Sequence, residues 1–172
     1  MKNDLVRQQA LALAREGIES SGLGPLEVNV LFTDVQATRA ALRAATELAT
    51  DLNAAIRVRA VIAVPLALPL DHPQVSIPFA EEALSALVWE FKQNSLDITA
   101  HLYLSRNRVE TFFEILPPNS LVVVAGRKRP WPTLQSRIAR RLQSEGHRVV
   151  FIPFRRRDST RAQGSRLLIG TR

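Results

Sequence analysis

The chain has 172 residues, of which 46% are hydrophobic, and it contains no cysteine. This length and composition predict one globular domain with a core, and the lack of cysteine excludes disulfides, thiolate metal sites and thiol catalysis. No apolar run approaches the roughly 18 residues that a membrane-spanning helix needs, and the charges among the first residues argue against a signal peptide. We therefore expect a cytoplasmic protein.

The net charge of +7 is unevenly distributed. Residues 126–144 contain six cations and no acid, and residues 154–172 contain six cations and one acid. The rest of the chain therefore carries 11 cations against 15 acids, so the body of the protein is mildly acidic. This distribution indicates that the basic segments bind a local anion or an acidic partner, and we expect no general binding to nucleic acid.

The first half of the chain alternates between helical and extended patterns. The predicted elements are a helix at 4–20, a strand at 27–33, a helix at 34–53 and a strand at 56–64. Gly22, Gly24 and Pro25 end the first helix. Four prolines make residues 65–78 a loop, because proline interrupts both helices and strands.

The second half continues the same alternation. The predicted elements are a helix at 77–94, a strand at 97–104, a helix at 106–116, a strand at 120–125, a helix at 133–145 and a strand at 149–152. The strand at 97–104 alternates strictly between apolar and polar residues. Gly146 closes the last helix at its C-cap, and we expect Pro153 to stop the last strand.

Strands that alternate with helices require a mostly parallel sheet covered on both faces. We predict an α/β fold, a three-layer α/β/α sandwich of Rossmann-like type with five parallel strands in the order 3-2-1-4-5. The predicted organisation is a helical extension at 1–24, the α/β domain at 25–154 and a flexible basic tail at 155–172.

In such a sheet, ligands bind where successive crossovers go to opposite faces, which here lies between the first and fourth strands. Asp34 follows the first strand and could accept hydrogen bonds from a ligand, although an aspartate before a helix is also a good N-cap. Gly126 ends the run 121–126 and could let the backbone approach a phosphate. The cations at 127–129 favour an anion there, or form a solvated surface loop.

Five segments resemble the universal stress protein family, and the resemblance covers residues 26–153. They read VLFTD at 30–34, RAALRAATELA at 39–49, VVVAG at 122–126, IARRL at 138–142 and VVFIP at 149–153. Nucleotide-binding members carry Gly, two residues, Gly, about nine residues, then Gly with Ser or Thr. Here Gly126 matches the first glycine, Arg129 replaces the second, and Gln135-Ser136 stands near the final pair.

The resemblance implies a degenerate nucleotide site that disfavours ATP binding of the family type. Its residues would be Thr33, Asp34, Val35, Val64, Ala125, Gly126, Arg127, Arg129 and Ser136. The resemblance implies no particular cofactor. Binding of ATP, AMP or a dinucleotide through side chains is an open alternative. The resemblance also implies a homodimer that pairs the last strand, at Val149, Val150, Phe151 and Ile152.

We expect no enzyme activity, no catalytic residue and no metal site. His72, His101 and His147 share no metal-ligand spacing, and no serine or threonine sits in a nucleophile elbow. The first hypothesis is thus a non-catalytic, dimeric stress-response or regulatory protein. Alternatives are a genuine adenine-nucleotide binder, or a regulatory domain that contacts a membrane transporter or an acidic protein through its arginine tail.

Overall fold

The computed structural model describes residues 26–70, 77–92, 96–127 and 132–154. The expected helix at 4–20, the tail at 155–172 and the cations Lys128 and Arg129 lie outside these residues. The strands are β1 (Glu27–Phe32), β2 (Ala55–Ala63), β3 (Ile98–Ser105), β4 (Leu121–Arg127) and β5 (Arg148–Phe154). The helices are α2 (Val35–Leu52), α3 (Ile77–Phe91), α4 (Arg108–Ile115) and α5 (Leu134–Ser144).

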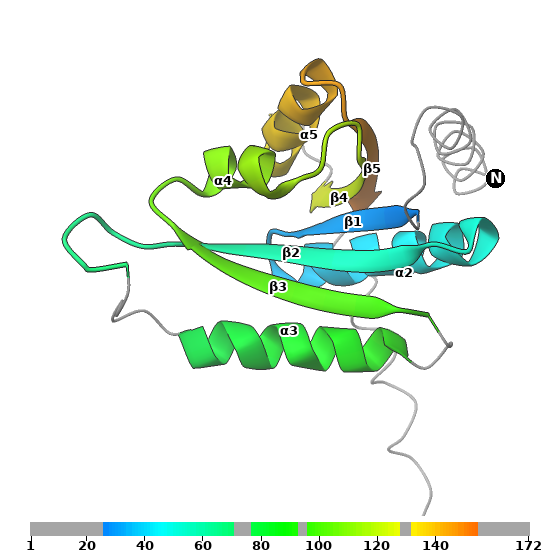
Figure 1. Ribbon diagram of the computed structural model, residues 1–172, viewed down its shortest axis with the longest axis horizontal. Helices are drawn as coiled ribbons and strands as arrows, with labels where there is room; N and C mark the ends of the chain where they lie inside the picture. Colours follow the sequence, from blue (N-terminus) through cyan, green and yellow to red (C-terminus); the bar gives the residue numbers. More distant parts are fainter. Residues whose placement is uncertain (1–25, 71–76, 93–95, 128–131, 155–172) are drawn as a thin grey trace, which may run out of the picture.

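The five strands form one sheet in the order β3-β2-β1-β4-β5, and every neighbouring pair is parallel. Helices α2 and α3 cover one face of the sheet, and α4 and α5 cover the other (Figure 1). This is the predicted three-layer architecture with the predicted strand order. Within the described residues, no helix is long and apolar enough to cross a membrane.

Alternating side chains on the central strands build a core on each face of the sheet. Val28 and Val30 of β1 and Val123 of β4 pack beneath α2, and all three are fully buried. Leu31 and Val122 face the other way and pack with Phe112 of α4. Both faces of β1 and β4 are therefore covered, which explains their nearly continuous apolar sequence.

Local sequence sets the ends of the helices. Asp34 is the N-cap of α2, and its Oδ1 accepts a hydrogen bond of 2.9 Å from the backbone N–H of Ala37. Asn53 ends this helix in the left-handed conformation, with φ of 49°. Gly146 follows α5 with φ of 90°, which confirms the predicted glycine stop.

Two predicted strand ends are wrong. β4 runs through Gly126 to Arg127, so this glycine lies within the strand and makes no turn. β5 runs through Pro153, which is paired in register with Gly126, and ends at Phe154. Among the described strands, β5 lies at the edge of the sheet and pairs on one side only, so a residue without an N–H is tolerated there.

Candidate ligand site at the carboxyl edge of β1 and β4

The strands β1 and β4 separate towards their carboxyl ends. Their pairing stops at Val30 and Val123, although β1 continues to Phe32 and β4 to Arg127. The helix after β1 lies on one face of the sheet and the helix after β4 on the other (Figure 1). This switch point is where open α/β sheets bind ligands, and we call it the β1/β4 edge.

The β1 side of the edge is formed by Thr33, Asp34 and Val35. The Asp34 carboxylate caps α2, and the Asp34 backbone oxygen accepts from both the N–H and the hydroxyl of Thr38, at 2.8 and 2.7 Å. Val35 packs against the core below α2. Thr33 Oγ1 is buried and has no hydrogen-bond partner, which is costly unless something else satisfies it.

The β4 side is tightly packed. Ala125 is 1% exposed, and Gly126 is buried against β5 and α5. A Cβ at position 126 would lie 2.8 Å from Cζ of Phe151 and 3.0 Å from Cβ of Gln135. The glycine is therefore required by the packing of this strand against its neighbours, independently of any ligand.

The other predicted site residues have structural contacts of their own. Ser136 donates from its N–H and its hydroxyl to Thr133 at the start of α5, at 3.2 and 2.9 Å. Val64 is 2% exposed and donates its N–H to the backbone oxygen of Ser105. Arg127 is exposed at the end of β4, and Arg129 lies outside the described residues.

Arg108, the first residue of α4, is a site residue that was not predicted from the sequence. Its Nη2 donates to the backbone oxygens of Phe32 and Thr33, at 2.6 and 3.1 Å, so the guanidinium lies on the end of β1. The same group lies over the ring of Phe112, 5.9 Å from its centroid. Burial lowers the pKa of Arg108, and the Asp34 carboxylate opposes this effect. Its Nε is buried and without a partner.

A second arginine acts in the same way on β2. Arg106 donates from Nη1 to the backbone oxygens of Val64 and Pro65, which follow the end of this strand. The carboxyl ends of parallel strands meet at one edge, so Arg106 and Arg108, which follow β3, come close to the ends of β2 and β1. The strand order predicted from the sequence could have identified both arginines, because it places the residues after β3 near the ends of β2 and β1.

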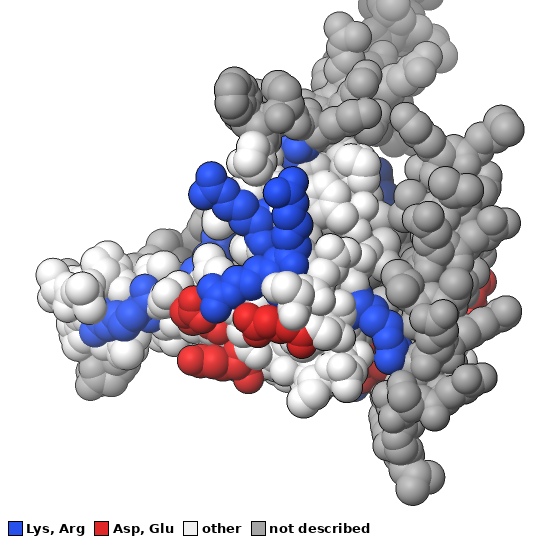
Figure 2. Space-filling view, turned by 90° about the horizontal axis from the view of Figure 1, so that it is seen from above, with Lys and Arg blue, Asp and Glu red and all other residues white. Residues whose placement is uncertain are grey.

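The layer of α4 and α5 carries further charge. Figure 2 looks down on this layer and shows Lys and Arg side chains gathered in one group, with Asp and Glu beside them. Arg141 of α5 pairs with Glu110 of α4 at 2.7 Å and lies 4.4 Å from the ring centre of Phe113. Arg137 and Arg140 are exposed on the same helix. The predicted basic helix is therefore a charged outer surface.

Chemically, the β1/β4 edge offers the Arg108 guanidinium, the Thr33 hydroxyl and the Asp34 carboxylate, which already caps α2. A guanidinium at this place suits the binding of an anion. Among the described residues, no group of three or more His, Cys, Asp or Glu could hold a metal ion.

No protein-family model matches this sequence, and no curated protein has a similar sequence. Among solved structures, a universal stress protein from Archaeoglobus fulgidus aligns over 78% of this chain and 98% of its own, with a TM-score of 0.57 and 17% identity. A universal stress protein in complex with cAMP aligns over 76% and 98%, with a TM-score of 0.42 and 17% identity. The fold is thus that of the universal stress proteins, which confirms the predicted resemblance at the level of the fold.

Proposed function

We propose that this protein is a non-catalytic stress-response or regulatory domain whose β1/β4 edge binds ATP weakly or not at all. Support comes from a universal-stress-protein fold in which groups expected to bind a nucleotide have other contacts. Asp34 caps α2, Ser136 bonds within the start of α5, and Gly126 is packed against Phe151.

The proposal rests on the position of the Arg108 guanidinium at the end of β1. A guanidinium that donates to the last carbonyl groups of β1 covers the backbone where a ligand would approach the switch point. A triphosphate needs several backbone amides within about 3 Å, which glycines normally permit. This chain has arginine at the second glycine position of the family motif and no Gly-Ser or Gly-Thr pair after it.

Calorimetric titration of the full chain with ATP, AMP and cyclic dinucleotides, with and without Mg²⁺, tests this proposal. We expect no saturable heat with Mg²⁺ and ATP below about 1 mM, which corresponds to less than roughly 4 kcal/mol of binding free energy. Tight magnesium-dependent binding of ATP would reject it. Absence of ultraviolet-absorbing material after denaturation of the purified protein would support the same conclusion.

A second candidate function, a genuine nucleotide binder, is favoured by one observation. Thr33 Oγ1 and Arg108 Nε are buried polar atoms without partners, and the Arg108 guanidinium contacts Thr33 after the end of β1. A phosphate or ribose oxygen could satisfy them if Arg108 rotated away from Thr33. In that case AMP should bind the native chain and fail to bind an Arg108→Met variant, whereas equal affinities would remove this candidate.

We also propose that the protein is a homodimer that pairs the β5 edge. The side chains of Val149 and Val150 are 6% and 5% exposed within one chain, so the contact would come from the free backbone edge of β5. Pro153 offers no N–H to such a contact, which confines it to the earlier part of the strand. Sedimentation at about 100 μM should give twice the chain mass of 19.2 kDa, and a monomer would contradict this.

A further inference from the structure

Helix α3 has an apolar outer face that nothing in the described chain covers. Of the exposed large hydrophobic side chains in the described residues, all but Leu134 lie between positions 66 and 89. Phe79 and Trp89 of α3 are 70% and 75% exposed, and Leu66 of the preceding loop is 86% exposed. Large apolar side chains grouped on an exposed face often mark an interaction surface, and this face of α3 carries two aromatic rings.

Four of the exposed residues of α3 form a stripe along the helix. Phe79, Glu82, Ala86 and Trp89 follow one another at intervals of three and four residues, and all four are exposed. The small side chain of Ala86 stands between the two aromatic rings, so a partner can lie close to the helix there. We call this set of four residues the α3 stripe.

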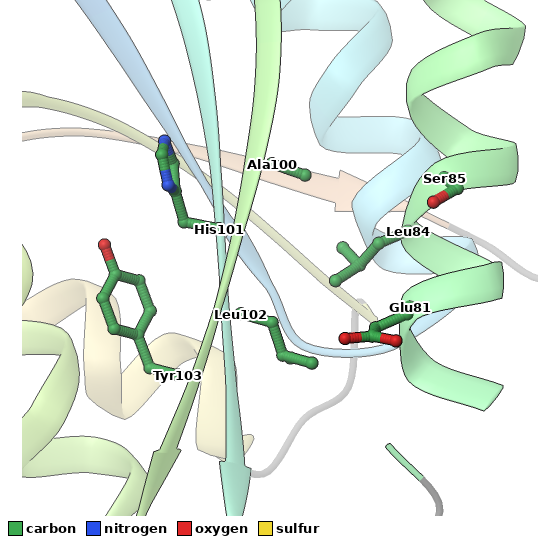
Figure 3. A pocket seen from close by; sticks show the side chains of 7 residues that line it. All are labelled: Glu81, Leu84, Ser85, Ala100, His101, Leu102 and Tyr103. Atoms are coloured by element: carbon green, nitrogen blue, oxygen red, sulfur yellow. The ribbon is translucent and has the colours of Figure 1, made fainter. Parts of the chain in front are cut away.

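Beside the α3 stripe lies a groove of about 390 Å³ at the free edge of β3. Glu81, Leu84 and Ser85 of α3 face Ala100 and Leu102 of β3 across it (Figure 3). His101 and Tyr103 point to the other side of β3 and complete its lining (Figure 3). The groove extends the α3 stripe to an unpaired strand edge.

The charge of this surface is acidic. The charged residues of α3 are Glu81, Glu82 and Glu90, and only Glu90 has an ion pair with a described residue, Arg39 at 2.9 Å. Two copies of this helix placed face to face would bring Glu81 and Glu82 of one copy close to those of the other, and an anionic membrane would be repelled. The surface therefore fits an occupant that is both basic and apolar.

We propose that the segment 155–172 of this chain is that occupant. It contains six arginines and one acid, and Arg161 and Arg166 precede the apolar run Leu167-Leu168-Ile169. The arginines complement Glu81 and Glu82, and the apolar run complements Phe79 and Trp89. An arginine against Trp89 also adds a cation–π contact.

The geometry allows this contact within one chain. Phe154, which precedes the segment, packs on the same face of the sheet as α2 and α3. β5 and β3 are the two outer strands, so their separation is four strand spacings, or about 19 Å. The chain from Phe154 can extend about 23 Å to Arg161 and about 43 Å to Leu167, which spans this distance.

Acrylamide quenching of Trp89 in the full chain tests this docking, with Trp131→Phe as the background so that Trp89 alone emits. We expect about a twofold lower quenching constant than in an R161S/R166S variant, because docking covers apolar surface of the ring. The difference should vanish near 0.5 M NaCl, where the Debye length is roughly 4 Å. An R43S/R137S variant, which removes two exposed arginines elsewhere, is the matched control and should keep the protection.

A charge exchange makes the test specific. E81K/E82K should lose the protection, and combining it with R161E/R166E should restore it. Equal quenching in the native chain and in R161S/R166S would overturn the proposal. Protection that grows with protein concentration and persists in R161S/R166S would also overturn it, because it would indicate pairing of two α3 stripes. Protection that grows with concentration and is lost in R161S/R166S would support docking of the segment onto a second copy.

Discussion

At the residue scale, His147 shows how burial sets a protonation state. The ring is 8% exposed, and its Nδ1 lies 3.0 Å from the hydroxyl of Ser120. Burial lowers the pKa of His147 below the ordinary value of 6.5, and the charge of Glu145 opposes this only in part. The neutral ring is therefore the form that the folded state favours.

This lowered pKa predicts a loss of stability in acid. The unfolded chain binds a proton at His147 more readily than the folded chain, so the free energy of unfolding falls as the pH drops below 6.5. Urea unfolding at pH 7.5 and 5.5 measures this loss, which should be smaller in a His147→Gln variant. An equal loss in the native protein and the variant would contradict the assignment to His147.

Arg108 is the second residue whose environment makes a prediction. Arg108→Met removes the guanidinium donor from the backbone oxygens of Phe32 and Thr33, which should cost about 1–3 kcal/mol of unfolding free energy. Arg106→Met is the control, because its acceptor Pro65 is exposed and its bond to the backbone oxygen of Val64 is longer, at 3.3 Å, so its loss should cost less than about 0.5 kcal/mol. Urea midpoints that shift equally in both variants would show that the Arg108 contact with β1 stabilises the protein no more than the Arg106 contact does.

The roles of the candidate site residues could be predicted only in part from the sequence. An aspartate before a helix fits an N-cap and a ligand acceptor equally well, and the structure shows Asp34 capping α2. Ser136 likewise bonds to Thr133 in the first turn of α5. Arg108 was not predicted because its acceptor Phe32 lies 76 positions away in the chain. Such contacts follow from topology and leave no local pattern.

At the element scale, the helices and strands themselves were predictable. Runs of β-branched residues predicted β2 and β4, and the spacing of apolar residues predicted α2, with Asp34 as a possible N-cap. The errors fell at Gly126 and Pro153, where the residue type suggests a break. Both residues lie on the pair β4–β5, where packing against Phe151 and an unpaired edge make glycine and proline acceptable.

The packing of β4 against β5 predicts a coupled pair of substitutions. Gly126→Ala should cost about 1–3 kcal/mol of unfolding free energy, because its Cβ would lie 2.8 Å from the Phe151 ring. Phe151→Leu should recover part of this cost in the double variant, although it destabilises the native chain on its own. Denaturant unfolding of the four proteins measures the coupling, and strictly additive effects would contradict this packing account.

At the scale of the whole molecule, the fold separates two surfaces with different charge. The sheet edge at β1 and β4 and the outer side of α5 carry arginines, while α3 on the opposite face carries glutamates and exposed aromatic rings. The chain thus combines a frame shared with universal stress proteins with an edge whose polar groups are largely engaged within the protein.

The amide resonances of Thr33, Asp34 and Gly126 report on the β1/β4 edge most directly. We expect them to keep their chemical shifts when Mg²⁺ and ATP are added to the full chain at about 1 mM, because Arg108 covers the end of β1 and Phe151 packs on Gly126. Saturable shifts of these three amides at micromolar ATP, with no change in β3 as the internal control, would contradict the account.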